Sequence, residues 1–187
     1  GFLPVIADVS EYLEFGCDNV ITVWADNSDD PTYPPGKPQD MLDFAYFGGI
    51  YRDCWMVVHN TVFITDPNYE DVKAGGGLFV SFDGVSEKKA GIRLDAHIRN
   101  SAGKAFSGKV VYELYDRDRK LVRRAEQKIS MADGQAGVAT AQMSVRQPHL
   151  WAPDSPYLYQ LHVLVKDRKG HVVDGYRRRV GIRSVEF

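Results

Sequence analysis

Apolar and polar residues alternate along much of the chain, and this period of two predicts β-strands rather than helices. The clearest alternation lies in the segment 157–165. Its apolar positions are Tyr157, Tyr159, Leu161, Val163 and Val165, with Gln160 and His162 between them. Because successive side chains of a strand point to opposite faces, the apolar set should face a core.

Seven strands are predicted in the C-terminal part of the chain, at 78–82, 92–98, 109–115, 121–129, 138–145, 157–165 and 172–180. Turn-forming residues separate several of them, at 100–103, 116–118, 133–134 and 167–170. Helical periodicity is almost absent. Short strands at this regular spacing are typical of an immunoglobulin-like β-sandwich.

The N-terminal part shows a weaker pattern of the same kind. Its predicted strands are 3–9, 19–25 and 50–58. One helical turn is predicted at 11–15, between Ser10, which is a good N-cap residue, and Gly16. Four prolines and a glycine lie in 28–38, and they exclude a helix or a central strand there. We therefore expect a surface loop at 28–38.

Three consecutive glycines, Gly75 to Gly77, lie between the two parts. A glycine run of this kind is flexible and is poor in the interior of any regular element, so it predicts an interdomain linker. The sequence thus predicts an all-β fold with two domains, 1–74 and 75–187.

Composition and charge exclude several classes of protein. With 44% apolar and 26% charged residues, the chain resembles an ordinary soluble globular protein. The net charge of -2, with both signs interspersed, provides no basic face for nucleic acid. No apolar run approaches the roughly 20 residues of a membrane span, and the N-terminus lacks a signal-peptide pattern. We expect neither nucleic acid nor membrane as a partner, and the location stays open between cytoplasmic and periplasmic or secreted.

The residues that commonly carry chemistry form no recognisable site by themselves. Cys17 and Cys54 lack metal-ligand spacing, so no metal or cofactor is predicted, and both are expected to be small buried side chains. His97 and His162 lie in predicted strands, where a hydrogen-bonded structural histidine is favoured over a catalytic base.

One stretch, 39–55, stands out because a double glycine joins the proline-rich loop to a predicted aromatic strand. It contains Asp43, Gly48 and Gly49, followed by Arg52. This stretch resembles a signature of the family 2 glycoside hydrolases, the β-galactosidase and β-glucuronidase group. In that family a similar aspartate lies on a sugar-binding jelly-roll domain and reaches into the active site. The resemblance therefore implies that Asp43 binds substrate.

A second resemblance to the same family covers the C-terminal part. The segment 148–159, which contains Trp151, resembles the turn before the last strands of the family's sandwich domain. The segment 179–187 is similar to the stretch that leads out of that domain. The motifs follow the family's order, so the resemblance covers essentially the whole chain. It implies a partial jelly-roll domain at 1–74 followed by the immunoglobulin-like sandwich at 75–187.

The family places its two catalytic glutamates on a (β/α)8 barrel after the sandwich. The resemblance therefore implies a non-catalytic segment of a retaining enzyme, most like a β-galactosidase, with the barrel and a β-galactoside as its partners. We expect this chain alone to be inactive. Half a jelly roll would expose apolar surface and sheet edges, so a homo-oligomer is possible. The alternative is a freestanding carbohydrate-binding or adhesion module.

The candidate residues also have structural interpretations. On local sequence alone, Asp43 could cap a turn. Arg52 is expected to hold the fold, since a buried guanidinium needs a carboxylate partner. Gly48 and Gly49 are expected to allow either close backbone approach or unusual dihedral angles at the start of the strand, and Trp151 is expected to be structural.

Adjacent carboxylates provide no convincing catalytic pair. A retaining glycosidase needs two carboxyl groups about 5 to 5.5 Å apart on either side of the scissile bond. We interpret Asp29 with Asp30, and Glu70 with Asp71, as solvated turns. Glu186 lies at the end of the chain, without a barrel to hold a partner.

Overall fold

The computed structural model divides the chain into two units, residues 1–57 and residues 58–187. It describes residues 4–32, 34, 36–44, 47–73 and 75–185. No helix among these residues is long and apolar enough to span a membrane. The domain boundary predicted near residue 75 stays a prediction.

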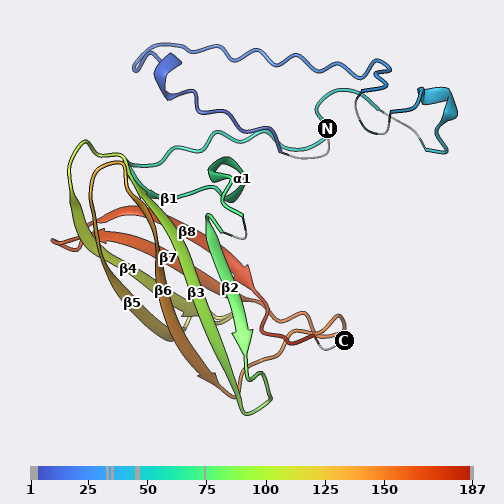
Figure 1. The fold of residues 1–187 in the computed structure, drawn as a ribbon. Helices are drawn as coiled ribbons and strands as arrows, with labels where there is room; N and C mark the ends of the chain where they lie inside the picture. Colours follow the sequence, from blue (N-terminus) through green and yellow to red (C-terminus); the bar gives the residue numbers. More distant parts are fainter. Residues whose placement is uncertain (1–3, 33, 35, 45–46, 74, 186–187) are drawn as a thin grey trace. The chain divides into compact units, whose positions relative to one another are not determined.

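Eight strands of the second unit form two antiparallel four-stranded sheets (Figure 1). The first sheet contains β1 (Val62–Ile64), β2 (Leu78–Asp83), β3 (Lys89–Asn100) and β6 (Ala136–Arg146). In it, β3 is central: β1 and β2 pair with successive parts of β3, and β6 pairs along nearly its whole length.

The second sheet has the order β5-β4-β7-β8. Its strands are β4 (Phe106–Tyr115), β5 (Leu121–Met131), β7 (Tyr159–Asp167) and β8 (Val172–Val180). The two sheets lie against each other as two layers, with apolar side chains from both between them (Figure 1). This arrangement is an immunoglobulin-like β-sandwich, and it confirms the predicted all-β fold.

The alternating pattern of the sequence fills the space between the sheets. On β7, the apolar residues Tyr159, Leu161, Val163 and Val165 are all buried, whereas the residues between them are partly exposed. Fully burying each aliphatic side chain of this size contributes about 1.5–3 kcal/mol. The hydroxyl of Tyr112 on β4 donates to the carbonyl oxygen of Ala139 on β6 at 2.5 Å, which joins the two layers.

One open edge of the sandwich is closed by a side chain. The backbone N–H of Ile64 on β1 donates to Oδ2 of Asp174 on β8 at 2.7 Å. An unpaired edge N–H would otherwise be a template for pairing with another chain. The carboxylate of Asp174 therefore satisfies β1 and holds it beside β8.

All seven strands predicted after residue 75 are present, most of them longer than predicted. Two elements of the second unit, β1 and α1, were not predicted. The strand β1 has three residues, too few to show a period. The helix α1 (Pro67–Glu70) is also short, but it had a local signal: Asp66 accepts from the N–H groups of Asn68 and Tyr69, and Pro67 occupies the first turn.

The first unit differs from the prediction. It contains two short 3-10 turns, η1 (Ser10–Tyr12) and η2 (Gln39–Met41), and its described residues form no strand. The strands predicted at 3–9, 19–25 and 50–58 are therefore wrong wherever the structure describes them, and the helical turn predicted at 11–15 is reduced to η1.

The physical reason is that a strand needs a neighbour to satisfy its backbone groups. These segments have β-forming residues but no ladder, and Val20, Trp24 and Trp55 are 90%, 89% and 79% exposed. The prediction that Cys17 and Cys54 are buried is wrong for the same reason, since both thiols are exposed. The assignment of 1–74 to a partial jelly roll remains a prediction.

Candidate functional site

The loop that carries Asp43 is held at its start by side-chain hydrogen bonds. The N–H of Gln39 donates to Oδ1 of Asp29 at 3.0 Å, and the Gln39 amide donates to the carbonyl oxygen of Asn27 at 2.8 Å. These contacts fix the first residue of η2 against the preceding loop. Asp43 follows η2 at an exposed bend.

Asp29 and Asp30 organise turns, as predicted. Oδ1 of Asp30 accepts both the N–H and the hydroxyl of Thr32, at 2.8 and 2.6 Å. These hydrogen bonds, the one from the hydroxyl first, hold the pKa of the Asp30 carboxyl below its ordinary value, so it stays ionised. A carboxylate committed to its own loop in this way is unsuited to proton transfer.

Asp43, in contrast, forms no hydrogen bond or ion pair with the other residues that the structure describes. Its exposed carboxylate can accept hydrogen bonds from the hydroxyls of a sugar, and such charge-assisted bonds are stronger than neutral ones. The neighbouring rings of Phe44 and Phe47 are 53% and 85% exposed, and apolar rings of this kind pack on a pyranose face. Tyr46, the third aromatic residue of this predicted surface, lies outside the described residues.

The two glycines of the motif have different structural demands. A Cβ on Gly48 would lie 2.6 Å from Cγ of Asn27, so any other residue here would require the Asn27 side chain to shift. Gly49 has a φ of +88°, which side chains strongly disfavour. The structural role of both glycines and their place in the family's sugar site stay predictions.

Arg52 is exposed, so the burial that would have required a carboxylate partner does not occur. Its guanidinium instead lies 5.4 Å from the ring centre of Tyr51, within the range of a cation–π contact. The fold-holding role assigned to Arg52 remains a prediction that this contact alone does not carry.

Trp151 lies in the second unit, where it is part of a packed turn. Its backbone N–H donates to the carbonyl oxygen of Ile182 at 2.9 Å, and the guanidinium of Arg183 lies 4.6 Å from the centre of the indole ring. A Cβ on Gly181 would lie 2.8–2.9 Å from Cβ, Cγ and Cδ1 of Trp151. The indole therefore packs directly on the backbone where the chain leaves β8.

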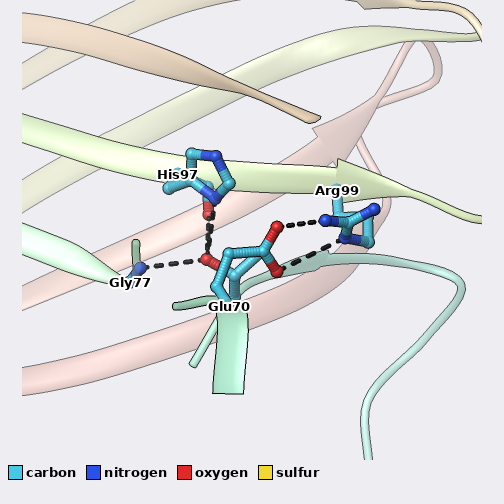
Figure 2. A network of polar contacts seen from close by, with 5 residues as sticks. Glu70, Gly77, His97 and Arg99 are labelled. Carbon is cyan, nitrogen blue, oxygen red and sulfur yellow. Dashed lines mark hydrogen bonds and ion pairs between the residues drawn. The ribbon is translucent and has the colours of Figure 1, made fainter. Parts of the chain in front are cut away.

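A polar network that the sequence did not reveal joins α1, the glycine run and β3 (Figure 2). The hydroxyl of Thr65 lies 2.9 Å from Nδ1 of His97 and accepts the N–H of Gly77 at 2.9 Å. The N–H of His97 donates to the carbonyl oxygen of Gly77 at 2.8 Å. Gly77, the last residue of the run predicted as a flexible linker, is therefore fixed to β3.

Thr65 and His97 are 3% and 9% exposed, so neither is available as a nucleophile or base for a ligand in solution. His97 is the buried, hydrogen-bonded structural histidine that its strand position favoured. Its contact with Thr65 links residues far apart in the sequence, and no pattern in either segment predicts that pairing.

Glu70 corrects a prediction. It was interpreted as part of a solvated turn, but its side chain is only 7% exposed and forms an ion pair with Arg99 of β3 (Figure 2). The hydrogen bond to Glu70, together with the carboxylate's charge, raises the pKa of Arg99 above its ordinary value. The pair fastens the helix α1 to the sheet. Among the described residues, no group of three or more His, Cys, Asp or Glu side chains could hold a metal ion.

Comparison with known proteins identifies relatives of the chain. The family model described as "Glycosyl hydrolases family 2" matches residues 77–183. A β-glucuronidase from Formosa agariphila is 27% identical over 190 aligned residues, covering 100% of this chain and 19% of the relative. A β-galactosidase from Thermoanaerobacter pseudethanolicus is 28% identical, covering 100% of this chain and 23% of the relative. The chain thus spans about a fifth of the length of these relatives.

Solved structures agree with these matches. The crystal structure of a β-glucuronidase from Bacteroides uniformis superposes with a TM-score of 0.71 and 25% identity, covering 86% of this chain and 18% of that one. Residues 77–183 contain β2 to β8 and Trp151, so the matched region includes nearly all of the sandwich.

Proposed function

Because this chain belongs to the glycosyl hydrolases of family 2, we propose that it is a non-catalytic part of a retaining glycosidase, and that Asp43 contacts the sugar. The observation that carries the proposal is the family match over residues 77–183, combined with relatives that align along the complete chain. In these relatives the aligned part is about a fifth of the protein. The catalytic residues can therefore lie in the part of the protein outside this segment.

The described residues suit a supporting role. They form a sandwich and a loop-rich first unit, and carboxylates such as those of Asp30 and Glu70 are already engaged in a turn and an ion pair. Asp43 differs because its carboxylate is exposed beside aromatic rings. It would orient a bound sugar by accepting hydroxyl hydrogen bonds, while catalytic carboxyl groups outside this chain cleave the glycosidic bond.

For the substrate we propose a β-galactoside. The relatives divide between β-galactosidases and β-glucuronidases at nearly equal identity, 28% and 27% for the two described above. Both sugars have ring hydroxyls that could donate hydrogen bonds to the carboxylate of Asp43. They differ at C6, which is a hydroxymethyl group in a galactoside and a carboxylate in a glucuronide, and in the orientation of the C4 hydroxyl. Direct competition between the two substrates is therefore the informative measurement.

The test uses the complete protein encoded by the gene that contains this chain. We expect it to hydrolyse an aryl β-galactoside faster than an aryl β-glucuronide. The substitution Asp43→Asn keeps the size of the side chain but removes its charge, so kcat/KM should fall by about tenfold or more. Asp18→Asn, which changes another exposed aspartate of the first unit, should leave kcat/KM within about twofold.

Preference for the glucuronide would refute the β-galactosidase proposal and leave the family assignment intact. Equal activity of Asp43→Asn and the unmodified protein would refute the role of Asp43. If the complete protein cleaved neither sugar while this chain bound galactose, the freestanding carbohydrate-binding module would be the better description.

A further inference from the structure

The outer face of the sheet β5-β4-β7-β8 contains a pocket of about 370 Å³. Its lining residues are Tyr115, Arg119, Gln160, His162 and Arg177. They come from three strands and a turn, so no local motif joins them. A volume of this size is within the range that binds small molecules.

Strand register explains why these side chains meet. Gln160 on β7 lies opposite Tyr115 on β4, and His162 on β7 lies opposite Arg177 on β8. Leu161, which lies between Gln160 and His162 on β7, is buried in the core. Because alternate side chains of a strand face opposite sides, the pocket residues project away from the core.

Several hydrogen-bonding groups in the pocket lack partners within the described part of the chain. The guanidinium groups of Arg119 and Arg177 and the amide of Gln160 form no hydrogen bond or ion pair there. Nε2 of His162 is buried and has no hydrogen-bond partner among the same residues. A buried polar atom without a partner disfavours the free state relative to one in which a ligand supplies a partner.

An acidic residue on the same face of the sheet is already engaged. Glu113 lies opposite His162 in the register, but one of its oxygens accepts the Tyr115 hydroxyl at 2.9 Å. The other lies 3.6 Å from Nε of Arg124 on β5. The charge of Glu113 is thereby balanced from the side away from β8. Neither arginine of the pocket forms an ion pair with another described residue.

Arg119 has a left-handed backbone conformation, which favours glycine over residues with a side chain. Its φ is +63°, in a turn held by the N–H of Lys120 donating to Oδ1 of Asp116 at 2.8 Å. A left-handed conformation costs a residue with a side chain on the order of 1 kcal/mol. An arginine at this point of the turn suggests that its side chain has a use other than stabilising the turn.

We propose that this pocket binds a small organic or inorganic anion through a carboxylate or phosphoryl group, with Arg119 and Arg177 as the charged partners. Guanidinium groups bind planar carboxylates and phosphoryl oxygens through paired N–H donors. Gln160 and His162 supply further polar contacts. The rings of Tyr115 and His162, whose centres are 4.9 Å apart, form the apolar wall.

The experiment is an NMR titration of the isotope-labelled 187-residue chain with glucuronate, inorganic phosphate and, as a neutral control, glucose. We expect glucuronate or phosphate to shift the amide signals of β4, β7 and β8 saturably, with a dissociation constant on the order of 1 mM or below. Comparison of the two anions identifies the carboxylate or the phosphoryl group as the preferred one. Added salt should weaken the binding, because the charges are partly exposed.

Two substitutions test the arginines, and a third serves as control. Arg177→Gln should weaken anion binding by about tenfold. Arg119→Gly should weaken it similarly while leaving thermal stability unchanged or raised, since glycine suits the turn. Arg168→Gln changes an exposed arginine of the β7–β8 turn outside the pocket lining and should leave the binding unchanged.

The proposal is overturned if neither anion gives saturable shifts, if glucose binds as well as glucuronate, or if Arg168→Gln weakens binding as much as Arg177→Gln. All residues of the pocket lie on the sandwich, and binding is measured without glycoside hydrolysis. Failure of this proposal would therefore leave the proposed function unaffected.

Discussion

At the scale of single residues, the sandwich depends on a few polar contacts made by partly or fully buried groups. Asn100 is the clearest example, since it is fully buried at the end of β3. Its amide donates to the carbonyl oxygens of Lys104 and Ala132 at 2.9 and 3.0 Å and accepts the N–H of Ala102 at 3.1 Å. One side chain thus organises two neighbouring turns, and sequence marked the position only as a break between strands.

The ion pair between Glu70 and Arg99 should contribute measurably to stability. Arg99→Gln leaves a carboxylate that is 7% exposed without its cation, so the free energy of unfolding should fall by roughly 1–3 kcal/mol. Urea denaturation measures this change. Lys109→Gln removes a partner from the more exposed pair with Glu126 and should cost about 1 kcal/mol or less. Equal effects of the two substitutions would contradict the structural role of Glu70.

Asp95 should make the sandwich sensitive to acid. The hydrogen bond from Arg93, with a further one from Thr140 at 2.6 Å, lowers the pKa of Asp95 below its ordinary 3.8. A lowered pKa stabilises the fold above pH 3.8, and that stability is lost as the pH falls through the folded-state value.

Asp95→Asn should therefore reduce the free energy of unfolding at neutral pH by on the order of 1 kcal/mol, and by less near pH 2. Urea denaturation of both proteins across this pH range gives the comparison. A difference that stays constant with pH would show that the ionised form of Asp95 has no special stabilising role.

At the scale of elements, the return of the chain from β8 depends on close packing between a glycine and an indole. Gly181 follows the end of β8, and Trp151 lies in the turn before β7. The two meet so closely that even a methyl group on Gly181 has no space. The shapes of Trp151 and of the backbone at Gly181 therefore fix the turn before β7 to the residues that follow β8.

Gly181→Ala should lower the free energy of unfolding by about 1–3 kcal/mol, because Trp151 or the backbone must shift. Thermal unfolding of the purified chain measures the loss. Gly137→Ala is the matched control: it lies in β6 with nothing within 4 Å of the added carbon, so it should be neutral or slightly stabilising. If both variants behaved alike, packing against Trp151 would not explain the requirement for glycine.

At the scale of the whole molecule, the two units differ in how they treat apolar residues. The sandwich buries its apolar side chains between two sheets, whereas the first unit leaves large ones exposed, among them Val5 at 98% and Phe15 at 90%. Exposed apolar side chains in such numbers are a surface for association with other protein. Homo-oligomer formation, expected from the sequence, would act through the first unit.

A shortened protein containing residues 58–187 should fold by itself and stay monomeric, because it includes both sheets and their core. Its midpoint of thermal unfolding should lie within a few degrees of that of the complete chain. Light scattering should show that the complete chain associates with rising concentration and that the shortened one does not. A strictly monomeric complete chain would contradict this expectation.

The sequence by itself determined the sandwich. A period of two in the apolar residues predicts its strands, since one face of each strand must be apolar. Turn residues mark the ends of the strands. The same reasoning failed before residue 58, because β-forming residues at 19–25 and 50–58 do not form strands without partners. The motif around Asp43 indicated the family without any coordinates.

Only the tertiary structure decided which distant residues meet. Glu70 appeared to be a solvated carboxylate until Arg99 of β3 was seen beside it, and Gly77 appeared to be a linker residue until Thr65 and His97 bound it. The pocket around His162 likewise depends on the register of β4, β7 and β8. Periodicity specifies the face on which a side chain lies, whereas its neighbours across strands are set by sheet order and register, which are long-range properties of the fold.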